Sequence, residues 1–201
     1  YYLYMVMDIY SRKIVGWQVH DCESSAHAAD LIEDIAHREK INKNQLVIHS
    51  DNGSPMKGAT LRAKMIDLEI SPSYSRPRVS NDNPYSESLF KTIKYHYTFP
   101  ENPFTCLKKA RAWVEKFVHW YNDEHQHSAI KFVTPNQRHN GLDRDILENR
   151  KKVIEQAREN HPERWNGRKT RNLTPIGAVF LNPGKDENNA TENKSQLKNA
   201  A

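Results

Sequence analysis

The chain opens with seven consecutive apolar or aromatic residues, Tyr1 to Met7, and this run constrains the fold more than any other segment. A strand that lacks polar alternation is buried on both faces, so other elements must cover the sheet on each side. The next apolar stretch, Ile14 to His20, alternates enough to return as an antiparallel partner after a turn at residues 8–13. The sequence therefore predicts a hairpin within a layered α/β domain.

Helices and strands are predicted to alternate after this hairpin. Apolar periodicity and capping residues predict helices from Ser24 or Ser25 to about Arg38, from Ser54 to about Leu68, from Pro84 onward with Asn83 as N-cap, from Thr105 to about Asn122, from Thr134 to Gly141, and from Asp143 to about Asn160. Strands are predicted at Gln45 to Ser50, at Ile70 to Ser75 as an edge strand because of Pro72, and at Ile176 to Leu181.

Composition sets bounds on the class of protein. A chain of 201 residues with 37% hydrophobic content can bury one substantial core, and its net charge of +5 is compatible with a polyanionic partner. Only Cys22 and Cys106 are present, so neither a disulfide framework nor a cysteine zinc site is expected. No run of eighteen apolar residues and no signal peptide occur, which predicts a cytoplasmic protein without a membrane partner.

Two carboxylates are the candidate catalytic residues. Asp51 follows the strand predicted to end at Ser50, Glu87 lies in the first turn of a predicted helix, and thirty-five residues separate them. Acids on two rigid elements suit Mg²⁺, which takes one or two carboxylates and leaves positions for water and phosphate. Lys94 lies two helical turns after Glu87, where it can hold a phosphate. The alternative is that Asp51 caps a turn and Glu87 only stabilises a helix dipole.

The sequence segments around these acids resemble a known family. The segments HSDNGSPM (residues 49–56) and SYSRPRVSNDNPYSESLFKTIK (residues 73–94) resemble the catalytic core of insertion-sequence transposases related to retroviral integrases, and the resemblance runs from Tyr1 to about Pro183. It implies a ribonuclease-H-like α/β fold, with a mixed sheet flanked by helices. It also implies an Asp, Asp, Glu triad that includes Asp51 and Glu87, with Mg²⁺ or Mn²⁺ as cofactor and transposon-end DNA as substrate.

The third acid of such a triad is not evident in the sequence. Asp8 closes the first strand and is a candidate, but it directly precedes the turn through Ser11 and Arg12, where its carboxylate can accept hydrogen bonds from turn amides. The resemblance places the catalytic Asp on a strand before this hairpin. We therefore expect the partner acid, the first strand of the sheet and a helix-turn-helix region to lie upstream of Tyr1, and Asp8 to be structural.

Several cations are candidates for contact with DNA. The residues expected to bind DNA are Lys94, Lys91, Asn52, Arg76, Arg78, Arg164, Arg168 and Lys169. Asn52 is also a candidate to orient a group bound to the metal. The two loop arginines, Arg76 and Arg78, read equally well as solvated surface charges. His125 and His127 raise a zinc hypothesis, which the lack of cysteine or acid partners at ligand spacing disfavours.

The sequence thus predicts a transposase-type polynucleotidyl transferase, active by metal-dependent phosphodiester hydrolysis and strand transfer and homo-oligomeric when intact. Predicted regions are a catalytic core at 1–141, a helical and basic extension at 142–184, and a disordered tail at 185–201. One alternative is a catalytically inactive remnant that binds DNA or a transposase subunit. A further alternative is a ribonuclease-H-type nuclease.

Overall fold

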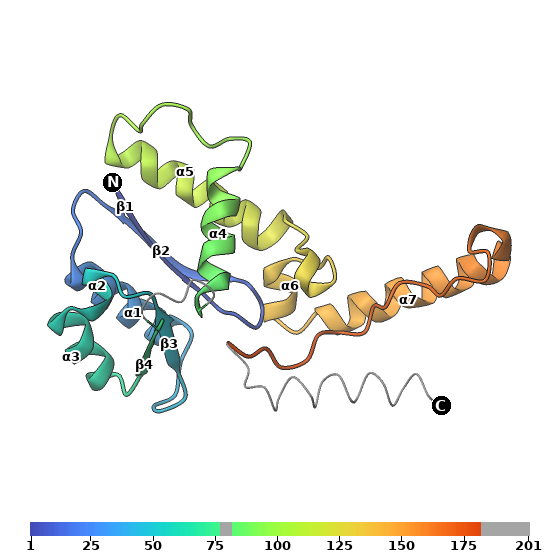
Figure 1. The fold of residues 1–201 in the computed structure, drawn as a ribbon, viewed down its shortest axis with the longest axis horizontal. Coiled ribbons are helices and arrows are strands. Elements are labelled where there is room, and N and C mark those ends of the chain that lie inside the picture. Colours follow the sequence, from blue (N-terminus) through green and yellow to red (C-terminus); the bar gives the residue numbers. More distant parts are fainter. Residues whose placement is uncertain (77–81, 182–201) are drawn as a thin grey trace.

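The computed structural model describes residues 1–76 and 82–181. Its strands are β1 (Tyr2–Met7), β2 (Ile14–His20), β3 (Val47–Ser50) and β4 (Ser71–Tyr74). Its α-helices are α1 (Ser25–Arg38), α2 (Ser54–Lys57), α3 (Ala59–Asp67), α4 (Pro84–Lys94), α5 (Leu107–His119), α6 (Pro135–His139) and α7 (Asp143–Asn160). Helices pack around two small sheets, and α7 leads away from both (Figure 1).

The opening hairpin forms as predicted. Strands β1 and β2 pair antiparallel, with Leu3 opposite Val19 and Met5 opposite Trp17. Alternate side chains of β1 enter different cores, since Tyr4 belongs to the core around α1 and Met5 packs against the core around α5. Both faces of β1 are therefore covered. Among the described residues, β1 pairs with β2 alone.

Strands β3 and β4 form a second, parallel sheet, with Val47 opposite Ser71 and Ser50 opposite Tyr74. The predicted edge position of β4 is confirmed, because within the described residues this strand pairs with β3 alone. Proline at position 72 is compatible with that edge, since it cannot donate a ladder hydrogen bond. The two sheets are not joined by hydrogen bonds between strands among the described residues.

Three hydrophobic cores hold the described part of the chain together. The first gathers α1 and α3 through residues such as Leu31, Ile35 and Leu61. The second joins β2, α4 and α5 through residues such as Ile14, Ile93 and Phe117. The third ties the start of α7 to the segment before α6, and its buried members are Ile130, Val133, Leu147 and Leu173. Amphipathic faces at helical spacing create these cores, as the sequence predicted.

One of the predicted helices differs from the structure. Helix α1 begins as predicted, because the Ser24 side chain accepts a hydrogen bond from the Ala26 amide. The predicted helix from Ser54 to Leu68 is instead two helices, α2 and α3, separated at Gly58, and Gly53 rather than Ser54 occupies the N-cap. A Cβ atom at Gly58 would lie 2.4 Å from Ser25 Cβ, so glycine here lets the chain pass closely beside α1.

The later helices follow the prediction closely. Helix α5 ends at His119, and the chain continues through Tyr121 in a wider π-helical turn, residues 120–124. Helix α6 begins with the predicted capping box, formed by Thr134 and Gln137. Gly141 follows it with φ of +73°, a conformation that glycine adopts without strain.

The region after α7 differs from the prediction. Residues 176–181 form no strand, and the described chain beyond a short turn at residues 162–164 is irregular. The predicted disordered tail at 185–201 lies outside the described residues. Among the helices that the structure describes, none combines the length and apolar character needed to cross a bilayer.

Candidate active site

Asp51 and Glu87 line the same cavity, which has a volume of about 830 Å³. Asp51 comes from the end of β3, and Glu87 comes from the first turn of α4, so two separate elements deliver the acids. Both side chains are exposed. The remaining lining residues are Asn52, Ser75, Arg76, Asn83, Ser86, Phe90, Lys91, Lys94 and Tyr95.

Local hydrogen bonds fix the turn that carries Asp51. Its Oδ1 atom accepts a hydrogen bond from the Gly53 amide at 3.0 Å, and the neighbouring Asn52 side chain donates to the Ser75 carbonyl at 2.8 Å. His49 Nδ1 lies 2.9 Å from Ser73 Oγ, which adds a second link from β3 to β4. Asp51 therefore caps this turn, which is the role that the alternative to metal binding gave it. Asn52, the predicted orienting group, spans the ends of the two strands.

One stripe of α4 faces the cavity. Glu87, Phe90, Lys91 and Lys94 follow the i, i+3, i+4, i+7 spacing of one helical face, and all four line the cavity. Leu89 and Ile93 are buried on the other side. Asn83 occupies the N-cap position of α4, as predicted, but its side chain makes no capping hydrogen bond and lines the cavity.

The cationic residues that line the cavity differ in whether they form an ion pair. Arg76 lines it, but its guanidinium donates to both carboxylate oxygens of the buried Asp82, at 2.8 and 2.9 Å. These hydrogen bonds, with one from the Arg76 amide, lower the pKa of Asp82 to about 2. Within residues 1–76 and 82–181, neither Lys91 nor Lys94 forms an ion pair, and both line the cavity. The expected contact Arg78 lies outside the described residues.

The donor set of the cavity fits a hard divalent cation. Two carboxylates supply oxygen ligands, and the open volume beside them leaves room for water and phosphate oxygens, as Mg²⁺ requires. Among the residues that the structure describes, no cluster of three or more His, Cys, Asp or Glu side chains could hold a metal. Among the described residues, Asp51 and Glu87 are the carboxylates that line this cavity.

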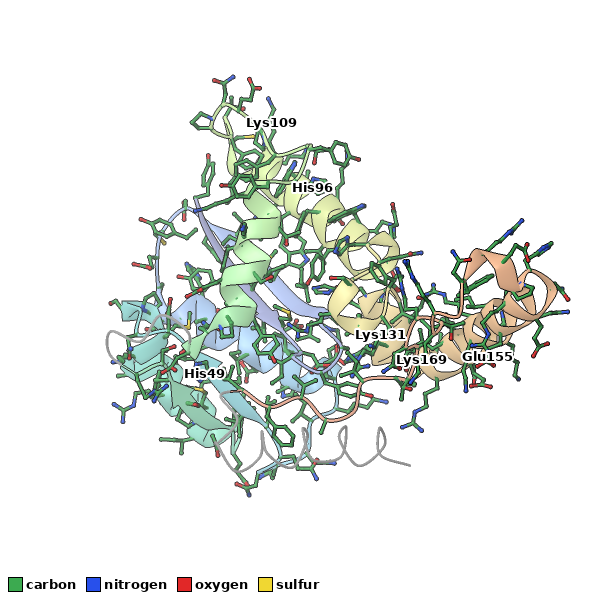
Figure 2. All side chains as sticks on the ribbon, turned by 45° about the vertical axis from the view of Figure 1, so that its right-hand side comes forward. His49, His96, Lys109, Lys131, Glu155 and Lys169 are labelled. Atoms are coloured by element: carbon green, nitrogen blue, oxygen red, sulfur yellow. The ribbon has the colours of Figure 1, made fainter. Side chains whose placement is uncertain are left out.

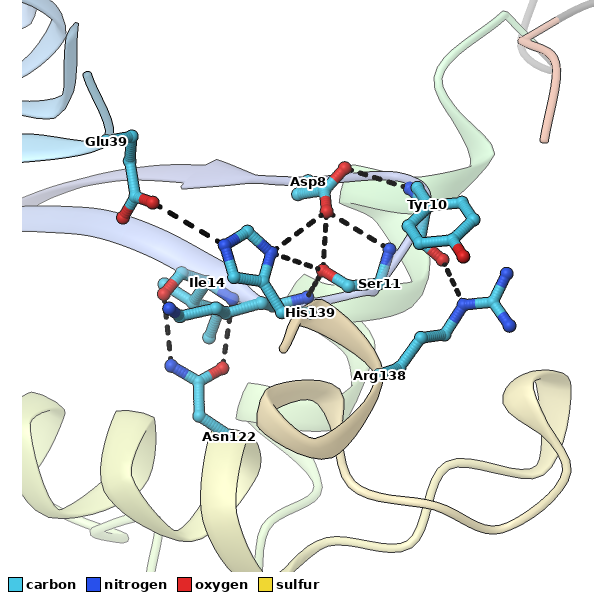
Figure 3. Close-up of polar contacts among 9 residues, drawn as sticks. Asp8, Tyr10, Ser11, Ile14, Glu39, Asn122, Arg138 and His139 are labelled. Atoms are coloured by element: carbon cyan, nitrogen blue, oxygen red, sulfur yellow. Dashed lines mark hydrogen bonds and ion pairs between the residues drawn. The ribbon is translucent and has the colours of Figure 1, made fainter. Parts of the chain in front are cut away.

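Asp8 is engaged elsewhere, in a polar cluster at the hairpin turn (Figure 3). Its carboxylate accepts hydrogen bonds from the Tyr10 and Ser11 amides at 3.0 and 3.2 Å and from Ser11 Oγ at 2.5 Å. His139 Nδ1 lies 3.3 Å from Asp8 Oδ2. Burial raises the pKa of Asp8, but these hydrogen bonds outweigh it and hold the pKa below its usual value. The predicted structural interaction with turn amides is confirmed.

The two histidines of the zinc hypothesis are packed among aromatic rings. His125 lies near Trp120 and Tyr121, and His127 Nδ1 accepts a hydrogen bond from the Ala129 amide. Burial lowers the pKa of His127 to about 4, with Arg12 and His125 adding to the effect. A metal cluster at these histidines is absent from the described part of the chain.

The basic residues of the C-terminal extension lie on an arm, which is formed by α7 and by the described chain that follows it, residues 161–181. Arg164, Arg168 and Lys169 are exposed in the turn after α7 and its return (Figures 1 and 2). None of the three lines the cavity of Asp51 and Glu87. These three cations are therefore separate from Asp51 and Glu87. If they contact DNA, they do so on a surface other than the cavity.

Two aromatic residues of the cavity escaped sequence reasoning. Tyr95 is 80% exposed and Phe90 is 40% exposed, and both line the cavity beside Lys91 and Lys94. The available signal was the i+3 spacing from Glu87 to Phe90, which places the ring on the acid's side of α4.

Comparisons with known proteins agree with this architecture. Two family models, both described as integrase core domain, match residues 1–80 and residues 68–135. The transposase for insertion sequence element IS904 of Lactococcus lactis is 26% identical over 135 residues, which are 67% of this chain and 53% of that protein. Transposase InsF for insertion sequence IS3A of Escherichia coli is 27% identical over 137 residues, 68% of this chain and 47% of that protein. The chain thus spans about half the length of these relatives.

A solved structure supports the fold. The simian T-cell lymphotropic virus intasome, in complex with the PP2A regulatory subunit B56 gamma, matches with a TM-score of 0.54 and 15% identity, covering 67% of this chain and 46% of that one. This likeness confirms the predicted ribonuclease-H-like α/β fold class. Together with the two family-model matches, this likeness assigns residues 1–135 to the integrase core domain family, and the chain is similar to transposases of insertion sequences.

Proposed function

We propose that this chain carries the catalytic face of a DNA transposase, a metal-dependent polynucleotidyl transferase. The observation that carries the proposal is the shared cavity, in which Asp51 and Glu87 stand beside Lys91 and Lys94. Two acids next to two unpaired lysines are the combination needed to hold a divalent cation and a DNA phosphate in one place. The substrate is DNA at a transposon end and at a target, and the intact protein works as a homo-oligomer.

Each residue has a defined role in this proposal. Asp51 and Glu87 would hold Mg²⁺, or Mn²⁺ in its place. The ion would supply Lewis-acid stabilisation of charge on a DNA phosphate. Lys94 and Lys91 hold neighbouring phosphates as point charges, and Asn52 keeps the Asp51 turn in register with β4. Water breaks a phosphodiester at the transposon end and leaves a 3′-hydroxyl and a 5′-phosphate. That 3′-hydroxyl then attacks a phosphodiester of the target strand, forming one new P–O bond while the 3′-oxygen of the target strand leaves as a hydroxyl.

Further contacts complete the proposed DNA path. Arg164, Arg168 and Lys169 on the arm extend the contact with the phosphate backbone beyond the cavity, and Tyr95 and Phe90 offer ring faces on which bases stack. The catalytic core is residues 1–141 and the extension is residues 142–184. The protein acts in the cytoplasm, at the bacterial chromosome.

A second candidate function is a catalytically inactive protein that binds DNA or a transposase subunit. It is favoured by one observation: among the described residues, two acids and not three line the cavity. Asp8, the other predicted acid, has its carboxylate committed to the hairpin turn. A third candidate is a ribonuclease-H-type nuclease. The experiment described next distinguishes it from the other two candidates.

The test combines ion binding with cleavage. Mn²⁺ affinity is measured by electron paramagnetic resonance, and nicking is measured on supercoiled plasmid and on an RNA–DNA hybrid. Asp51→Asn and Glu87→Gln are each expected to weaken Mn²⁺ binding at least about tenfold, whereas the control Glu159→Gln on α7 leaves it unchanged. Plasmid nicking lost in both cavity variants supports the transferase.

Other outcomes have distinct meanings. Mn²⁺ and DNA binding without nicking by the unsubstituted chain supports the inactive DNA-binding protein. Cleavage of the RNA strand of the hybrid alone supports the nuclease. Equal Mn²⁺ affinity in all four proteins excludes the proposed metal site, because the two acids then contribute nothing to ion binding.

A further inference from the structure

Asp82 is a buried carboxylate behind the wall of the candidate active site. It is 2% exposed, whereas its neighbour Asn83 and its ion-pair partner Arg76 both line the cavity. Its carboxylate accepts three hydrogen bonds from Arg76, from the amide at 2.7 Å, from Nε at 2.9 Å and from Nη2 at 2.8 Å. One acid thus holds both the backbone and the guanidinium of one residue.

The Arg76–Asp82 ion pair joins two elements of the fold. Arg76 comes two residues after the end of β4, and Asp82 comes two residues before the start of α4. Hydrogen bonds from a guanidinium to an ionised carboxylate are stronger than neutral ones, and the planar fork of arginine constrains their direction. The ion pair therefore fixes the start of α4 against the end of β4.

The end of β4 is in turn fixed to the turn that carries Asp51. Ser75 immediately precedes Arg76, and its carbonyl accepts a hydrogen bond from the Asn52 side chain at 2.8 Å. Asn52 is the residue next to Asp51 in the chain. A continuous series of covalent and hydrogen bonds therefore runs from the Asp51 turn through Ser75 and Arg76 to Asp82.

The other end of this series reaches Glu87. Asn83 follows Asp82, and its carbonyl accepts a hydrogen bond from the Glu87 amide at 3.2 Å, in the first turn of α4. The Asn83 side chain makes no capping hydrogen bond, so the start of this helix lacks the side-chain support that a cap provides. The separation of Asp51 and Glu87 thus depends on the ion pair that holds Asp82.

We infer that Asp82 is a positioning residue, which acts through Arg76 to keep Asp51 and Glu87 at the separation that one divalent cation requires. This role rests on the proposed function, because it concerns the same two acids. It assigns Arg76 to support of the site rather than to contact with a DNA phosphate, since the Asp82 carboxylate already accepts hydrogen bonds from its guanidinium. Loss of a residue that orients metal ligands typically lowers metal affinity by about ten- to a hundredfold.

Mn²⁺ affinity of the full chain, measured by electron paramagnetic resonance, tests this role. Asp82→Asn removes the ionised acceptor and keeps the size of the side chain, and it is expected to weaken Mn²⁺ binding about tenfold. Arg76→Gln removes the donor of the same ion pair and is also expected to weaken binding about tenfold. Asp34→Asn is the matched control, because it breaks an exposed ion pair with Arg38 on α1 and should leave the affinity unchanged.

The Arg76→Gln variant separates positioning from simple electrostatics. Removal of a positive charge from the cavity wall strengthens cation binding if charge alone matters, whereas loss of the ion pair weakens it if Asp82 positions the acids. A merely structural role would lower the fraction of the chain that binds Mn²⁺ and leave the dissociation constant of the folded fraction unchanged. Circular dichroism identifies any variant that does not fold, and Arg76→Lys, which keeps the charge without the fork, then takes its place with the same expected loss.

Three results would overturn the inference. The first is unchanged Mn²⁺ affinity in Asp82→Asn, and the second is equal or tighter Mn²⁺ binding in Arg76→Gln. The third is a smaller binding fraction with an unchanged dissociation constant. Failure of the proposed function gives a different result, because Asp51→Asn would then bind Mn²⁺ as tightly as the unsubstituted chain, and the ion pair would have no metal site to support.

Discussion

The largest fully buried side chain belongs to a charged residue, Arg138. Its Nε donates to the Tyr10 carbonyl at 2.7 Å, and its two Nη atoms reach Asp143 at 3.3 Å and the Ile176 carbonyl at 2.9 Å. The guanidinium also lies over the Tyr10 ring, 4.2 Å from its centroid. One residue of α6 therefore links the hairpin turn, the start of α7 and the chain that returns from the arm.

Replacement of Arg138 by methionine is expected to lower the free energy of unfolding by about 3–5 kcal/mol, because Asp143 would remain buried without its charged partner. Urea unfolding followed by circular dichroism measures the change. Arg158→Met, at an exposed position of α7, is the control and should cost less than about 0.5 kcal/mol. Similar losses in both variants would show that the buried linkage contributes little.

His127 makes stability depend on pH. Its pKa in the folded chain is about 4, below the usual 6.5, so the unfolded chain binds more protons between these values. Stability should therefore be complete above about pH 6.5 and fall as the pH drops toward 4. Thermal unfolding midpoints at pH 7.5 and 5.0 measure the slope. His127→Asn should flatten it, and an unchanged slope would assign the effect to other groups.

Among the elements, strand β2 and helix α1 approach each other unusually closely at Gly16. A Cβ atom at this position would lie 2.4 Å from Ile35 Cδ1 and 3.1 Å from Leu31 Cδ1. Gly16→Ala is expected to lower the free energy of unfolding by about 1–3 kcal/mol through overpacking. Calorimetry measures the loss, and Gly177→Ala, where the added atom meets nothing within 4 Å, is the control.

A double mutant separates overpacking from a backbone effect at Gly16. Ile35→Ala removes both side-chain atoms that a Cβ would meet most closely. The combined variant should therefore lose less stability than the sum of the two single changes. Strict additivity would show that the cost of Gly16→Ala arises in the backbone.

Elements with local signals were predictable from the sequence. The hairpin, the Ser24 cap and the Thr134 capping box each depend on residues within a few positions of one another. The break at Gly58 was not, because its cause is Ser25, which is distant in sequence. The role of Arg138 was missed for the same reason, since its partners include Tyr10 and Ile176.

The candidate site was predictable in part at the scale of the whole molecule. Spacing and wording identified Asp51, Glu87 and Lys94, and the structure brings all three to one cavity. Sequence reasoning missed that Asp82 accepts hydrogen bonds from the Arg76 guanidinium. Among the described residues β1 pairs with β2 and β3 pairs with β4, which is compatible with the expectation of a further strand upstream of Tyr1.

Ion binding is expected to stabilise the whole chain. A ligand that binds only the folded state adds about 2.7 kcal/mol when present at one hundred times its dissociation constant. Thermal unfolding with increasing Mg²⁺ or Mn²⁺ should therefore show a rising midpoint in the unsubstituted chain and a much smaller rise in Asp51→Asn. Identical rises in both proteins would place the stabilising ion elsewhere.

The two acids are anchored in different cores. Asp51 follows a strand that packs with the core of α1 and α3, whereas Glu87 belongs to a helix whose buried residues join the core of α5. A divalent ion held by both would thus act as a clasp between the two halves of the molecule. A small rotation of the part built on the first core against the part built on the second would move the two acids apart. The protein would then lose the metal ion, although every side chain near the acids stays intact.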